Sequence, residues 1–152
     1  MNFNKEAFLS AGQKAVANST FVIQCPTGDW PGVVAKIDAE QAPTTKDPSK
    51  LYTRFIAFIE INEPQVVEKT KRSPTTVRHD FFLDTTEDGS GLDMSDGKNI
   101  GLGRLREALD LNRPGQSWSF EQFVGRPLIA HVEHESYNGE QYAKVTRVAK
   151  RQ

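Results

Sequence analysis

Two segments of the chain, 51–61 and 76–84, each carry aromatic and basic side chains on one of their two alternating sets of positions. These side chains are Tyr52, Arg54, Phe58, Arg78 and Phe82. Alternate residues of a β-strand share one face, so each segment predicts a strand that presents rings and guanidinium groups together. Unpaired bases stack on rings and phosphates pair with cations, so this pattern is typical of a surface that binds single-stranded nucleic acid. The alternative interpretation is that Phe58 and Phe82 pack beneath a helix or a loop.

The opposite faces of the same two segments are apolar. In 51–61 the alternate positions are Leu51, Thr53, Phe55, Ala57, Ile59 and Ile61, and in 76–84 they are Val77, Phe81 and Leu83. This alternation predicts that Phe55 and Phe81 point into the core while Phe58 and Phe82 point outward. A one-residue bulge in either strand would reverse the assignment.

The overall charge does not favour nucleic acid, because 19 Lys and Arg stand against 20 Asp and Glu, a formal net charge of −1. Any affinity for phosphate must come from local clusters. Segment 69–78 holds basic residues and no acid, segment 84–96 holds acids, and the last residues are basic again. We expect phosphate contacts from Arg54, Lys69, Lys71, Arg72 and Arg78, with Lys46, Lys50 and Lys144 at the margins. Trp30 and Tyr137 are further candidates for stacking.

Enzymatic chemistry finds less support in the sequence. His131 and His134 are three residues apart in a predicted strand and so point to opposite faces, which prevents both from holding one metal ion. The acidic segment 84–93 lacks the EF-hand spacing. Cys25 precedes a proline, and no Gly-x-Ser-x-Gly motif is present. We therefore predict no catalytic residue, no metal and no cofactor.

The predicted elements follow the order strand, strand, strand, helix, strand, strand. Strands are expected over 30–39, 51–62, 76–85, 127–135 and 140–148, and a helix over 99–109 with Asn99 as its cap. Asn138-Gly139 predicts a two-residue turn between the last two strands. This is the order of a mainly β, five-stranded OB-fold barrel with a helix between strands three and four. The whole chain, 1–152, is expected to form one domain, with an N-terminal helical extension over 1–19 and an extended arm over 64–75.

The single cysteine excludes an internal disulfide and fits a reducing compartment. Residues 1–12 lack the apolar core of a signal peptide, and no segment has the length of a membrane-spanning helix. These features predict a cytoplasmic protein that does not contact membranes.

The C-terminal half resembles small phage-encoded single-stranded DNA-binding proteins of the OB-fold type. The resemblance rests on GLGRLREAL over 101–109, FEQFVGRP over 120–127 and HVEHESYNG over 131–139. The first half is similar only in the order of its strands. The resemblance implies a role in phage DNA replication or recombination, and so localisation in the host cytoplasm. Many single-stranded DNA-binding proteins end in an acidic tail that recruits partners, whereas this sequence ends in Lys150, Arg151 and Gln152.

The resulting hypothesis is a non-enzymatic protein that binds single-stranded DNA without strong sequence preference. Its expected partners are single-stranded DNA and replication or recombination proteins. One alternative is a protein-binding adaptor that uses the same aromatic face, and another is a small metal-dependent nuclease built on the acidic loop.

Overall fold

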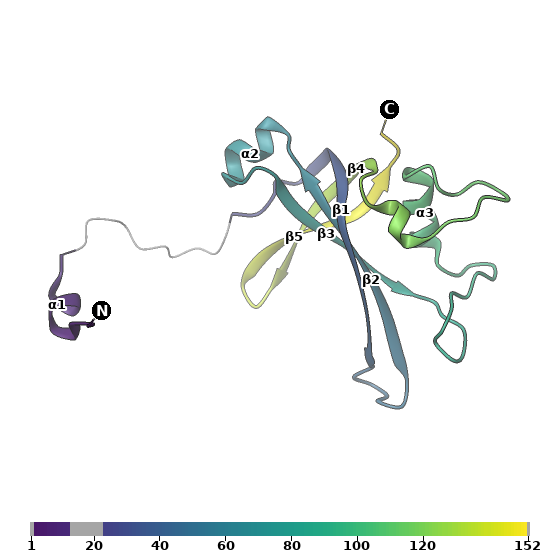
Figure 1. Ribbon diagram of the computed structural model, residues 1–152, viewed down its shortest axis with the longest axis horizontal. Helices are drawn as coiled ribbons and strands as arrows, with labels where there is room; N and C mark the ends of the chain where they lie inside the picture. Colours follow the sequence, from purple (N-terminus) through teal and green to yellow (C-terminus); the bar gives the residue numbers. More distant parts are fainter. Residues whose placement is uncertain (1, 13–22, 152) are drawn as a thin grey trace.

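Five antiparallel strands form one open sheet in the computed structural model, which describes residues 2–12 and 23–151 (Figure 1). The strands are β1 (Gly28–Pro43), β2 (Leu51–Ile61), β3 (Thr75–Leu83), β4 (Pro127–Tyr137) and β5 (Glu140–Ala149). The helices are α1 (Lys5–Ser10), α2 (Pro64–Thr70) and α3 (Ile100–Ala108), and a short 3-10 helix, η1, spans Phe120–Phe123. The hydrogen-bonded order of the sheet is β3-β2-β1-β4-β5.

The long strand β1 joins the two halves of the sheet. Its first part, from Gly28 to Val33, pairs with β4, and the part from Val33 to Pro43 pairs with β2. The register of the second pairing shifts between Val34 and Lys36, and a bulge of this kind bends a strand and increases its twist. The two edge strands, β3 and β5, lie next to one another, although no ladder of the described residues joins them.

The predicted strands and the central helix are confirmed to within a few residues at their ends. The largest difference is in β1, which runs four residues beyond the predicted end at Ala39 because its pairing with β2 continues to Pro43. The Asn138-Gly139 turn is also confirmed, since both residues have positive φ, 51° and 79°.

The extended arm predicted over 64–75 is wrong, because most of these residues form α2. Pro64 stands at the start of the helix, where its missing N–H costs nothing. Val66 and Thr70, one turn apart, are both buried, and the Thr70 hydroxyl donates to the Val66 carbonyl at 2.9 Å. Burial of this face fixes the segment against the sheet.

The sequence predicted Asn99 as the cap of α3, but its side chain makes no capping hydrogen bond. The residue adopts the left-handed conformation, with φ 52°. Its amide instead ties the acidic loop to the helix. Asn99 Oδ1 accepts from the Asp84 N–H at 2.8 Å, and its Nδ2 donates to the carbonyls of Asp84 and Asp93 at 2.8 and 2.9 Å.

The core lies on the face of the sheet that carries Phe55, Ala57, Ile59 and Ile61 of β2, all at most 2 % exposed. Side chains of α3 and η1 cover this face, and all belong to one cluster of buried residues. Gly32 allows close packing at its edge, since a Cβ there would lie 2.7 Å from Cγ2 of Ile59.

The N-terminal helix is shorter than predicted within the described residues. Asn4 caps its start, with the Ala7 N–H donating to Asn4 Oδ1 at 3.0 Å, and the helix buries none of its residues. Residues 13–19 of the predicted extension lie outside the described part of the chain. None of the helices in 2–12 and 23–151 has the length and apolar character needed to cross a membrane.

Candidate nucleic-acid interface

The outer face of β1, β2 and β3 arranges its side chains in rows across the strands. One row contains Lys36, Phe58 and Arg78, because Lys36 pairs with Phe58 and Phe58 with Arg78. The pairing of β2 with β3 is continuous from Thr53 to Ile61, so no bulge reverses the faces. The inward positions of Phe55 and Phe81, 2 % and 7 % exposed, are therefore confirmed.

Phe58 is on the predicted outer face, but its ring is enclosed by cations. The Lys36 ammonium lies 5.4 Å from the ring centroid and the Arg78 guanidinium lies 5.7 Å from it. Both distances are within the range of cation–π attraction. The ring is half-buried, and a base that stacked on it would compete with these cations for the ring.

Phe82, in contrast, is 70 % exposed. Its pairing partner on β2 is Arg54, and the ring of Tyr52, the diagonal neighbour two residues earlier, meets it edge-on with centroids 5.7 Å apart. The two rings form an aromatic pair with an open face, as stacking with an unpaired base requires.

The two arginines of this face are held by carboxylates. Arg78 donates from Nε and Nη2 to Asp80 at 3.2 and 3.0 Å. Arg54 forms an ion pair with Glu40 and a second one with Asp80, at 3.4 Å from Nη1 to Oδ2. A phosphate must compete with Asp80 to reach Arg78, and with both Glu40 and Asp80 to reach Arg54.

A groove of about 1000 Å³ lies between β3 and the hairpin formed by β4 and β5. Four of the sequence-predicted residues line it, namely Arg54, Arg78, Phe82 and Tyr137. Lys144, expected only at the margin, also lines the groove and pairs with Glu135 at 2.8 Å. The groove thus combines rings and cations from both edges of the sheet.

The other predicted residues lie elsewhere. Trp30 packs against the core and donates from Nε1 to the Pro26 carbonyl at 2.9 Å, so the stacking role expected of it has no support. Lys69, in the last turn of α2, and the two basic residues after this helix are not among the groove residues. Arg72 donates from Nη2 to the Ile23 carbonyl at 2.9 Å.

Sequence reasoning missed two groove residues, Tyr142 and His79. Tyr142 pairs with Glu135 across the hairpin, which makes it a diagonal neighbour of Tyr137 on the same face. The Asn138-Gly139 turn fixes this register, so the second tyrosine could have been predicted by counting back from the turn. The Tyr142 hydroxyl donates to Glu140 at 2.8 Å.

His79 forms part of the groove floor and is only 9 % exposed. Its Nδ1 is enclosed and has no hydrogen-bond partner, and its ring lies 4.0 Å from that of Phe81. Burial lowers the pKa of His79 to about 4, and the nearby carboxylate of Asp80 opposes this shift more weakly. The imidazole is therefore neutral at physiological pH.

The remaining candidates for chemistry are spread over the fold. His131 Nδ1 meets Asp29 at 2.7 Å, whereas His134 Nε2 meets the Cys25 carbonyl at 2.7 Å. Burial raises the pKa of the Cys25 thiol to about 11, which keeps it protonated. Among the described residues, no group of three His, Cys, Asp or Glu side chains could hold a metal ion.

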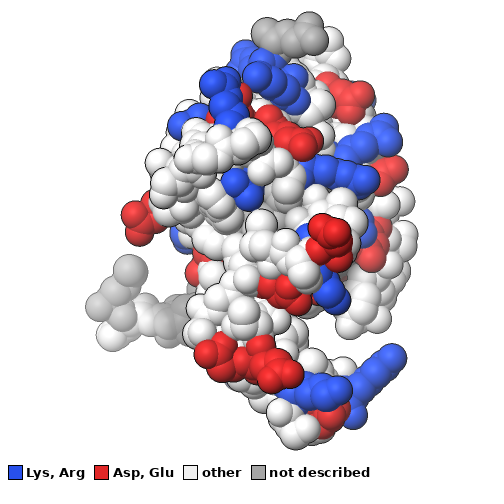
Figure 2. All heavy atoms as spheres, turned by 90° about the vertical axis from the view of Figure 1, so that its right-hand side faces the viewer, with Lys and Arg blue, Asp and Glu red and all other residues white. Residues whose placement is uncertain are grey.

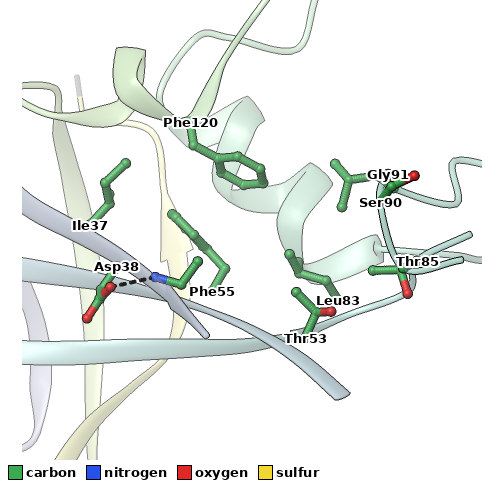
Figure 3. A pocket seen from close by; sticks show the side chains of 12 residues that line it. Ile37, Asp38, Thr53, Phe55, Leu83, Thr85, Ser90, Gly91 and Phe120 are labelled. Carbon is green, nitrogen blue, oxygen red and sulfur yellow. Dashed lines mark hydrogen bonds between the residues drawn. The ribbon is translucent and has the colours of Figure 1, made fainter. Parts of the chain in front are cut away.

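A second, smaller pocket of about 380 Å³ lies on the core side of the sheet, beside the acidic loop. Figure 3 shows Phe55 and Phe120 lining it together with Ile37 and Leu83. The loop is tied to β1 by Gln41, whose Nε2 donates to the Gly89 carbonyl at 3.0 Å. This pocket is apolar and does not adjoin the outer face that carries Phe82.

The charges do not form one extended basic surface on the face seen in Figure 2. Acidic and basic side chains are interspersed across this side of the molecule.

Comparison with protein-family models finds no family that matches the chain, and comparison with curated proteins finds no match either.

Proposed function

We propose that the protein binds single-stranded DNA in the groove between β3 and the β4–β5 hairpin, without catalysing a reaction. The observation that carries the proposal is the composition of this groove. Exposed rings of Phe82 and Tyr137 lie beside Tyr142, and cations come from both sheet edges. Rings that accept any base and cations that accept phosphates give affinity with little sequence preference.

The strand arrangement supports an OB fold as the framework of this proposal. The strand order, the helix between β3 and β4, and the pairing of β1 with both β2 and β4 all agree with that fold. Oligonucleotides bind OB folds at strands two and three and at the loop between strands four and five. The groove adjoins those elements.

Binding would exchange the carboxylate partners of the cations for phosphates. Asp80 holds Arg54 and Arg78, and Glu135 holds Lys144. Stacking on the open face of Phe82 offsets part of the free energy needed to separate these pairs, since one stacked base contributes about 1–3 kcal/mol. A duplex cannot gain this contribution because its bases are already stacked.

The cellular role that we propose is protection of single-stranded DNA in the cytoplasm during phage replication or recombination. It follows from the resemblance of 99–150 to phage single-stranded DNA-binding proteins. Replication or recombination proteins would be the partners.

A fluorescence titration with a thirty-nucleotide single strand and with its duplex tests the function. We expect tighter binding to the single strand at moderate salt, and weaker binding of Phe82→Ala. Phe3→Ala is the matched control, because Phe3 is 73 % exposed and belongs to the α1 region. Equal or tighter binding to the duplex would contradict the proposal.

The carboxylate pairing favours one second candidate, a protein-binding adaptor. Each cation that lines the groove already has an acidic partner, so the groove offers little uncompensated positive charge. An adaptor that binds through Phe82 and the two tyrosines would not need such charge. Binding of a single strand that weakens with rising salt separates the two candidates, because phosphate contacts release counterions.

A further inference from the structure

The floor of the groove contains a polar group that neither the fold nor the proposed stacking explains. His79 belongs to the row of inward-facing residues of β3, between Val77 and Phe81, which are both buried. A hydrophobic side chain would fit this environment. An imidazole there leaves Nδ1 enclosed without a partner, and an unsatisfied buried polar group costs free energy.

The second ring nitrogen is the one that can meet a ligand. Nδ1 is enclosed and Nε2 is not, while the residue as a whole lines the groove. Because the imidazole is neutral, one nitrogen carries a proton and the other carries a lone pair. The form with the proton on Nε2 avoids enclosing an N–H that has no acceptor, so Nε2 offers a donor to the groove.

The surroundings of Nε2 select the kind of group that would accept this proton. Val145 is 3 % exposed and Ala143 is half-buried, and both line the same groove as His79. A phosphate would lose much of its hydration beside these apolar side chains and would gain only a neutral donor there. The carbonyl oxygen of a flat, neutral base would lose less, and its ring would cover the apolar floor.

We propose that His79 reads an inserted base, donating a hydrogen bond from Nε2 to a carbonyl oxygen such as those of thymine. This inference rests on the proposed binding of single-stranded DNA. It adds one polar contact to a surface that otherwise binds through stacking and charge. The residue is a specificity determinant, since a base without an acceptor at this point would leave Nε2 unpaired.

The test compares thymidine oligonucleotides with oligonucleotides that carry difluorotoluene in place of thymine. The two bases share a shape, but difluorotoluene lacks the carbonyl acceptors. We expect the wild-type protein to bind the thymidine strand about fivefold more tightly, the value of one ordinary hydrogen bond. His79→Phe, which keeps a flat ring beside Phe81, should bind both strands equally.

The outcomes distinguish the inference from the function on which it rests. Failure of the wild-type protein to bind either strand would overturn both. Binding with no preference for thymine, or a preference that survives in His79→Phe, would overturn the role of His79 and leave the proposed function standing.

A second measurement needs no variant at position 79. The chain has three histidines, so the ¹⁵N resonances of His79 can be assigned with His131→Asn and His134→Asn. The Nε2 resonance should shift when the thymidine strand binds and shift less with the difluorotoluene strand. An Nε2 resonance that responds equally to both strands would contradict a hydrogen bond to the base.

Discussion

The two ends of the outer face of β2 and β3 use the same residue types in different states. At one end, Phe58 lies between Lys36 and Arg78 in its row, and both cations are within cation–π distance of its ring. At the other end, Phe82 is 70 % exposed and meets only the edge of Tyr52 among the ring contacts of the described residues. Cross-strand neighbours therefore decide whether a ring stabilises the fold or remains open to a ligand.

The same difference extends to the cations. Arg78 serves both ends, since its guanidinium covers Phe58 while it donates to Asp80. Arg54 lies beside Phe82 in its row and pairs with Glu40 and Asp80. A ligand at the Phe82 end must compete with Asp80 for both arginines, and with Glu40 as well for Arg54.

The largest expected effect is on the free energy of unfolding, and it distinguishes the core-facing from the outward-facing phenylalanines of β2 and β3. Phe55→Ala and Phe81→Ala should each lower the free energy of unfolding by about 3–5 kcal/mol, because each leaves a cavity in the core. Phe82→Ala should change it by much less. Chemical denaturation of the three variants measures this, and a similar loss in all three would mean that Phe82 belongs to the core.

The orientation of these rings could be predicted because a strand has a period of two residues and neither β2 nor β3 contains a bulge where they pair. The order of the strands and the Asn138-Gly139 turn were also accessible, since local patterns and turn residues determine them. These features depend on residues close together in the sequence.

The environment of each ring could not be predicted in this way. That Lys36 covers Phe58 depends on the register between β1 and β2, which shifts at the bulge after Val34. That His79 and Tyr142 share a groove depends on the approach of β3 to β5, which are far apart in the sequence. The helix α2 was missed because it has only seven residues, with one proline at its start and two buried side chains. So short a segment does not show a helical period clearly.

The next effect concerns the groove floor below the Phe82 end, and it depends on pH. The pKa of His79 falls from 6.5 to about 4 on folding, so the unfolded chain binds the proton more tightly. The contribution of His79 to the free energy of unfolding should therefore be fully present above pH 6.5. It should be lost as the pH falls toward 4, by roughly 3 kcal/mol in total. Denaturation across this pH range measures the decline.

The control for this pH dependence is His79→Phe, which removes the titrating group. Carboxylates titrate in both proteins, so the difference between the two curves isolates the histidine. If the unfolding free energies of the two proteins depended on pH in the same way, His79 would not be desolvated. The groove floor would then not differ in this respect from the open rings above it.

A smaller effect tests the comparison of the two rings directly. Phe82→Ala should weaken binding to single-stranded DNA by about 1–3 kcal/mol, the value of a stacked base. Phe58→Ala should affect binding less and should instead lower stability, because it removes two cation–π contacts worth about 0.5–1 kcal/mol each at exposed sites. Titration and thermal unfolding of both variants measure the two effects. If Phe58→Ala weakens binding as much as Phe82→Ala, the enclosed ring also takes part in stacking.

The smallest effect concerns Asp80, which links the two ends through its arginines. Asp80→Asn should free the Arg78 guanidinium and leave Arg54 paired with Glu40 alone. We expect it to tighten binding to single-stranded DNA by about 1 kcal/mol, the upper part of the range for exposed ion pairs. The slope of log K against log salt should become steeper by up to about 0.7 for each new phosphate contact. Asp38→Asn is the matched control, since Asp38 pairs with Ile56 in the same row, changes the net charge equally and holds neither arginine. Equal gains in the two variants would mean that net charge alone is responsible, and an unchanged slope in Asp80→Asn would mean that these arginines do not contact phosphates.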